Sequence, residues 1–157
     1  MRLNLGRSIS SSKMEIFIVM SQFIVIALHF IEINLFNKKL IQTDYQIFDD
    51  VGNIIIFLAL TFIIISIKDL GKYISPFPRP KEKSELITSG IYSIISHPMY
   101  YSLILISIGF FIKSFTLYNL ILSILLSIIV SIKINLEEGY LTKKFINYKL
   151  YKRKVKI

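Results

Sequence analysis

The sequence lacks cysteine altogether, which excludes disulfide bonds, thiolate metal sites and cysteine nucleophiles. It is also poor in acidic residues, because 10 Asp and Glu stand against 19 Lys and Arg, for a net charge of +9. Proline is scarce, with four residues, three of which fall at positions 76, 78 and 80. Since each proline pushes its predecessor out of the helical region, we expect extended backbone there, within a stiff linker over 68–89.

Apolar residues are abundant instead. A hydrophobic content of 54% and a mean hydropathy of +0.61 are too high for an ordinary soluble fold. A length of 157 residues corresponds to one domain. We therefore predict a single all-α membrane domain over 1–157, a polytopic protein with four transmembrane helices plus a C-terminal amphipathic helix. The predicted spans are 16–36, 51–67, 99–112 and 115–136.

The first apolar run follows a basic N-terminal segment, as a signal peptide would. It is about 21 residues long and lacks a small-residue cleavage site, so a retained spanning helix is favoured. Within it, His29 and Glu32 lie three residues apart and share a helix face. Either this pair is buried and marks a functional path, or both side chains reach toward the outer interface, and we favour the second interpretation.

A polar stretch ends at His97, where the third apolar run begins. Proline is tolerated only in the first turn of a helix, so Pro98 is predicted to be the first helical residue and His97 to lie at the membrane boundary. A hairpin of two spans returns the chain to the same side, where His97, Tyr100, Glu137 and Glu138 can share one pocket. The alternative is that His97 merely starts a helix and that the glutamates are a solvated first turn of the tail helix.

The segment after residue 136 has the pattern of an amphipathic helix. Apolar residues recur there at spacings of three and four, and lysines cover the remaining positions. The stripe consists of Leu136, Tyr140, Leu141, Phe145, Tyr148 and Tyr151.

Basic residues set the predicted orientation. With four spans, the N-terminus, the 68–89 segment and the C-terminal tail lie on one side and hold most of the 19 basic residues, whereas Lys38, Lys39 and Lys113 fall on the other. The positive-inside rule then predicts an integral protein of the cell membrane with both termini cytoplasmic. The positive charge also favours contact with anionic lipid headgroups. Nucleic-acid binding is not expected, because no nucleic-acid module is recognisable.

Four sequence elements follow one another in the second half of the chain. They are PFPRP at 76–80, LITSGIY at 86–92, HPMY at 97–100, and the glutamate pair at 137 and 138 followed by Leu141, Phe145, Tyr148 and Tyr151. In order and spacing they resemble the isoprenylcysteine carboxyl methyltransferase and phospholipid methyltransferase group of integral membrane enzymes. We therefore expect 1–75 to supply two N-terminal spans and 76–157 to form a methyltransferase-like half.

The resemblance implies a helical membrane fold that binds S-adenosyl-L-methionine between the last two spans and the tail helix. The implied methyl acceptor is lipophilic, isoprenylcysteine carboxylate-like or phospholipid-like, and enters from the lipid at the cytoplasmic face. Catalytic roles are implied for His97 and Glu138. The cofactor-binding residues it implies are Tyr92, His97, Pro98, Tyr100, Glu137, Glu138, Leu141 and Tyr148. Methyl transfer from a sulfonium is an in-line displacement that requires positioning and no metal.

The chain departs from this group at several positions. Ser96 stands where arginine usually precedes the His-Pro pair, and Lys133 and Asn135 stand where arginine precedes the glutamates. Lysine cannot reproduce the two parallel hydrogen bonds that arginine makes to a carboxylate. Two other functions remain open: a membrane reductase of the sterol-reductase type that uses NADPH, and a non-catalytic membrane protein that keeps the fold.

Overall fold

The computed structural model describes residues 3–31, 40 and 46–155, with side chains from residue 12 onward. Over these residues the secondary structure is entirely helical, as predicted. Its elements are α1 (Leu3–Leu28), α2 (Gln46–Leu70), the short 3₁₀ helices η2 (Gly71–Tyr73) and η3 (Gly90–Ser93), α3 (Pro98–Ser114), α4 (Leu117–Lys144) and α5 (Tyr148–Lys154).

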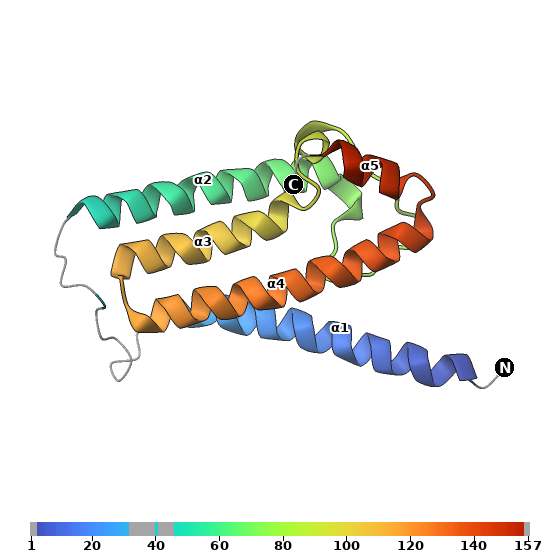
Figure 1. Cartoon of the computed structure of the whole chain (residues 1–157), viewed down its shortest axis with the longest axis horizontal. Coiled ribbons are helices and arrows are strands. Elements are labelled where there is room, and N and C mark those ends of the chain that lie inside the picture. Colours follow the sequence, from blue (N-terminus) through green and yellow to red (C-terminus); the bar gives the residue numbers. More distant parts are fainter. Residues whose placement is uncertain (1–2, 32–39, 41–45, 156–157) are drawn as a thin grey trace.

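The four long helices lie side by side and alternate in direction (Figure 1). α2 packs on α3, α3 packs on α4, and α4 packs on α1. This alternation brings the start of α1, the end of α2, the start of α3, the end of α4 and all of α5 to one end of the bundle, which we call the α5 end. The prediction that the start of the third apolar run and the end of the fourth meet is therefore confirmed.

Two of the described helices are long and apolar enough to cross a membrane, namely α2 together with η2, and α4. α3 is apolar but has 17 residues, fewer than a typical span. The helix bounds differ from the predicted runs, because α1 begins at Leu3 and ends at Leu28, and α2 covers Gln46–Leu70. An apolar run marks the part of a helix that avoids water, whereas backbone hydrogen bonding carries the helix on into polar residues. The predicted end of the first run, 32–36, lies outside the described residues.

Two glycines allow α2 and α3 to approach closely. A Cβ atom at Gly52 would lie 2.7 Å from the carbonyl oxygen of Gly109 and 2.8 Å from Cβ of Lys113. A Cβ atom at Gly109 would lie 3.0 Å from the carbonyl oxygen of Gly52. Small residues at such a contact let two helix backbones meet, which is the main source of attraction between apolar helices in lipid.

The start of α3 is as predicted, with Pro98 as its first residue and His97 preceding it. Its end is not. Lys113 and Ser114, which lie between the third and fourth predicted spans, both belong to α3. The chain reverses at Phe115, whose φ of 46° is left-handed. Thr116 then caps α4, because its hydroxyl accepts a hydrogen bond from the backbone N–H of Asn119.

The predicted single tail helix is wrong. α4 continues through Glu137 and Glu138 to Lys144, and the chain then turns before the short α5. The turn allows Tyr148 and Tyr151 to become buried, together with Val155, against partners that a straight helix would have left exposed. Those partners are Leu86, Leu141 and Phe145. Burial of aromatic side chains thus overrides the helical periodicity of this segment.

The linker prediction is confirmed for residues 74–89, which form no helix, but its first residues are helical, because 68–70 belong to α2 and 71–73 form η2. Its far end is fixed by Asp69 of α2, whose carboxylate accepts a 2.8 Å hydrogen bond from the backbone N–H of Ile91. Gly90 has a φ of +60°, and a Cβ atom there would lie 2.1 Å from the Asp69 carboxylate. Only glycine suits this position, because the backbone is left-handed there and no space is left for a Cβ atom. The contact holds η3 against the end of α2.

His29 lies at the opposite end of the bundle and is buried, so the interpretation that it reaches toward the interface is wrong. Its Nδ1 lies 2.9 Å from the carbonyl oxygen of Val25, and its Nε2 lies 2.7 Å from the hydroxyl of Ser107. The Ser107 hydroxyl in turn lies 2.9 Å from that of Ser123. This polar contact joins the end of α1 to α3 and α4. Glu32, its predicted partner, lies outside the described residues.

Candidate functional site

His97 and Glu138 meet at the α5 end of the bundle. Nε2 of His97 lies 3.1 Å from Oε1 of Glu138. The same carboxylate oxygen lies 2.6 Å from Nζ of Lys152 on α5, and this ammonium also donates a 3.0 Å hydrogen bond to the hydroxyl of Ser96. The start of α3, the end of α4 and α5 are therefore joined by one polar cluster.

The chemistry of the pair follows from its surroundings. Burial lowers the pKa of His97 to about 4, although Glu138 opposes the shift. The ring is thus neutral at physiological pH. A carboxylate can only accept hydrogen bonds, so the proton must be on Nε2 of His97 and be donated to Glu138. The ion pair of this cluster is formed by Glu138 and Lys152.

Glu137 points to the other side of α4 and is held by Tyr100 of α3. The Tyr100 hydroxyl donates a 2.5 Å hydrogen bond to Oε2 of Glu137. The Tyr100 ring stacks on His97, with centroids 5.7 Å apart and an interplanar angle of 21°. Nζ of Lys133 also lies near this ring, 5.0 Å from the Tyr100 ring centroid. Tyr100 therefore contacts both Glu137 and His97.

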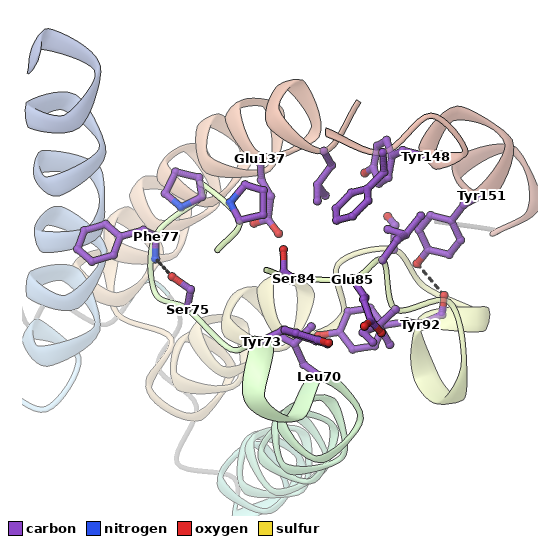
Figure 2. A pocket seen from close by; sticks show the side chains of 17 residues that line it. Leu70, Tyr73, Ser75, Phe77, Ser84, Glu85, Tyr92, Glu137, Tyr148 and Tyr151 are labelled. Carbon is purple, nitrogen blue, oxygen red and sulfur yellow. Dashed lines mark hydrogen bonds between the residues drawn. The ribbon is translucent and has the colours of Figure 1, made fainter. Parts of the chain in front are cut away.

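A small cavity of about 90 Å³ opens beside Glu137 (Figure 2). Its walls come from the end of α2, the linker, η3, the end of α4, and α5. Figure 2 shows Glu137 and Tyr148 across the cavity from Tyr73 and Tyr92. The Tyr151 hydroxyl donates a 2.7 Å hydrogen bond to the carbonyl oxygen of Tyr92, which ties α5 to η3.

The predicted cofactor residues divide into two groups. Four of them line the cavity, namely Tyr92, Glu137, Leu141 and Tyr148. The other four, His97, Pro98, Tyr100 and Glu138, are not among its lining residues and form the layer next to it. The Tyr148 hydroxyl connects the two groups, because it lies 3.5 Å from Nε2 of His97.

Three tyrosines of the cavity wall, Tyr92, Tyr148 and Tyr151, remain protonated at physiological pH. Burial raises the pKa of Tyr92 and of Tyr148, and nearby carboxylates raise both further. Burial raises the pKa of Tyr151 to about 12. The wall therefore combines neutral phenol groups and aromatic faces with the carboxylates of Glu85 and Glu137.

Several residues of this region were missed by sequence reasoning. Lys152 was assigned to a basic helix face, yet it pairs with Glu138. Glu15 and Gln22 of α1 are buried, and each contacts a residue that lies near the cavity. Their spacing could have indicated a buried polar face. Glu15, Gln22 and His29 lie seven residues apart in a mostly apolar stretch and share one helix face.

Among the described residues, no group of three or more His, Cys, Asp or Glu side chains is placed to hold a metal ion. The carboxylates instead suit hydroxyl or ammonium groups, and the aromatic walls suit a flat ring or a soft cation. The fold and the site thus define an all-helical membrane protein with a carboxylate-lined cavity at one end of its bundle.

Comparison with known proteins makes the identification more specific. Residues 49–147, more than half of the chain, match the phospholipid methyltransferase family. The chain belongs to this family, which confirms the predicted kinship and identifies it as a membrane methyltransferase of the kind that acts on lipids. Neither the curated proteins nor the solved structures contain a match. The matched region excludes α1 and α5.

The neutral state of His97 predicts a pH-dependent stability. Its folded pKa of about 4 lies below the ordinary 6.5, so between these values the unfolded chain binds a proton that the folded chain does not. Stability is therefore complete above pH 6.5 and falls as the pH drops toward 4, by about 3 kcal/mol at 1.36 kcal/mol per pKa unit. Thermal melting of the detergent-solubilised protein between pH 7.5 and 4.5 measures this loss.

The matched control is His97→Gln, which keeps a hydrogen-bond donor toward Glu138 but cannot titrate in this range. We expect the variant to lose less stability than the native chain on acidification. Parallel pH profiles for the two proteins would contradict the assignment of a buried, neutral His97.

Proposed function

We propose that this chain is an S-adenosyl-L-methionine-dependent methyltransferase that modifies a lipophilic acceptor at the cytoplasmic face of the membrane. One observation carries the proposal. In a chain of a lipid methyltransferase family, the Glu137 carboxylate lies on the wall of a cavity between α4, α5 and the linker, fixed by a hydrogen bond from Tyr100.

The residues present fit this cofactor. Glu137 and Glu85 offer carboxylate oxygens to the ribose hydroxyls and to the ammonium group, and a carboxylate beside the cavity also favours a sulfonium cation. Tyr92 and Tyr148 offer ring faces to a flat purine and hydroxyls to polar atoms. Leu70, Leu86 and Leu141 add apolar wall.

The methyl group is transferred by in-line displacement: a bond forms from the acceptor nucleophile to the methyl carbon while the carbon–sulfur bond breaks and leaves a neutral thioether. The chain's own residues hold and orient the reactants and exclude water, which accounts for much of the acceleration of such reactions. We assign the binding role to Glu137. We assign to His97 and Glu138 the positioning of the acceptor, since their cluster lies next to the cavity wall and Glu138 remains partly exposed.

The cofactor assignment is tested by equilibrium binding of S-adenosylmethionine, S-adenosylhomocysteine and NADPH to the purified protein in lipid nanodiscs. We expect the first two to bind and NADPH not to bind. Glu137→Gln keeps the size of the side chain and removes its charge, so it should weaken binding of S-adenosylmethionine by about 1.5–3 kcal/mol, the range for hydrogen bonds to charged groups.

Glu82→Gln is the matched control, because Glu82 is an exposed carboxylate of the same linker and is absent from the cavity wall. It should bind the cofactor as the native chain does. Binding of NADPH alone would favour the reductase alternative, and binding of neither cofactor would favour the non-catalytic one. Unchanged affinity in folded Glu137→Gln would reject the role of this carboxylate.

We also propose that the α5 end faces the cytoplasm. The described linker and α5 carry many basic residues. Lys113 instead lies in the last turn of α3, and this helix ends at the opposite end of the bundle. The absence of cysteine makes this directly measurable, because an introduced cysteine is the only thiol. In intact cells, an impermeant thiol reagent should label Lys113→Cys and spare Lys83→Cys and Arg153→Cys. The reverse pattern would invert the orientation.

The acceptor is proposed to arrive through the lipid. Large apolar side chains such as Ile94 and Leu105 are exposed on and beside α3, so the surface near the polar cluster is suited to lipid chains. An apolar tail contributes on the order of 0.8 kcal/mol per methylene on leaving water, but little when it moves between lipid and protein. The membrane then acts mainly by concentrating and orienting the acceptor.

Entry from the lipid and entry from water can be distinguished with two acceptors that have the same headgroup. One carries a long acyl or prenyl chain, and the other is truncated to a methyl group. With protein in bilayers we expect the truncated compound to lose most of its turnover. Equal methylation of both compounds would mean that the acceptor comes from water.

A further inference from the structure

Lys133 is a buried cation for which the site described above has no role. It lies in α4 with only 2% of its surface exposed. Its ammonium donates a 2.7 Å hydrogen bond to Oε1 of Gln22, a buried residue of α1. A buried ammonium is costly, and apolar residues of similar size often stabilise a fold as well or better. Stability alone therefore does not account for this pair.

The position of Lys133 connects it to the cofactor site through Tyr100. Its Nζ lies 5.0 Å from the centroid of the Tyr100 ring, within range of a cation–π interaction. The same ring also stacks on His97, and its hydroxyl donates to Glu137. Lys133 also precedes Glu137 by one helical turn, so that its positive charge acts on that carboxylate. The orientation of Tyr100 thus depends on what holds Lys133.

We propose that Gln22 is a positioning residue of the methyltransferase site: α1, although outside the family match, fixes Lys133 against Tyr100 and thereby fixes Glu137 and His97 for their reactants. The inference rests on the proposed function of Glu137. Gln22 touches no reacting group and acts only through Lys133.

A second contact of α1 supports this role. Glu15 lies seven residues before Gln22 on the same face and is also buried. Its Oε1 accepts a 3.1 Å hydrogen bond from Arg79 and a 2.6 Å hydrogen bond from the Tyr140 hydroxyl. Arg79 lies between Pro78 and Pro80, two residues of the cavity wall. The same face of α1 therefore holds both the linker wall and the Lys133–Tyr100 contact.

The test uses Gln22→Leu, Lys133→Met and the double variant in nanodiscs, with binding of S-adenosylmethionine and thermal melting as the two measurements. Each single variant should raise the Kd on the order of 5- to 50-fold. In the double variant both polar groups are replaced, so the melting temperature should recover while the affinity stays as low as in Lys133→Met. A merely structural contact predicts instead that affinity recovers with stability.

Two further variants serve as controls. Gln22→Glu keeps the acceptor oxygen and should retain native affinity. Ser21→Ala removes a neighbouring hydroxyl that donates to the carbonyl oxygen of Phe17 in the same helix, and it should change neither measurement. Native affinity in folded Gln22→Leu, or an equal loss from this substitution in the native and Lys133→Met backgrounds, would overturn the inference.

A ligand-free measurement separates this inference from the proposed function. With 3-fluorotyrosine incorporated throughout, the ¹⁹F resonance of Tyr100 can be assigned by its loss in Tyr100→Phe. It should shift in Gln22→Leu and not in Ser21→Ala. A shift in a protein that binds no S-adenosylmethionine would retain the positioning role and reject the cofactor, whereas an unmoved resonance would reject the positioning role itself.

Discussion

The hydrogen bonds from Tyr100 to Glu137 and from His97 to Glu138 fix the start of α3 against the end of α4, and the rest of the site depends on them. In lipid, apolar side chains alone give little energetic preference for one helix partner or one rotation, because lipid chains are as apolar as the side chains. Close backbone contact, as at Gly52 and Gly109, supplies attraction. Polar contacts between helices supply the register.

A polar contact also holds α5 against the start of α3 and the end of α4. Its ammonium at Lys152 contacts both Glu138 and the hydroxyl of Ser96, so a cation lies beside His97 although position 96 is neutral. Ser96 stands where the resemblance described above leads us to expect arginine. A lysine from another element thus supplies positive charge here, but without the two parallel hydrogen bonds of a guanidinium. This difference bears on which acceptor headgroup the site can hold.

Patterns in the sequence determined much of the outline. Its apolar runs predicted a helical membrane protein. Its prolines predicted the start of α3 at Pro98 and a linker over 68–89, of which 74–89 is non-helical in the structure. The motifs around His97 and Glu137 identified the family. These features depend on local backbone chemistry and composition, which a sequence displays directly.

The tertiary structure alone decided the rest. Which carboxylate faces the cavity depends on the rotation of α4, since Glu137 lines it and Glu138 turns toward His97 and Lys152. The break before α5 follows from the burial of Tyr148 and Tyr151, which overrides a helical pattern. The contact of Gln22 with Lys133 joins residues 111 positions apart, and no local sequence pattern predicts it. Such contacts arise only when the helices pack, because their energy comes from burial and pairing across elements.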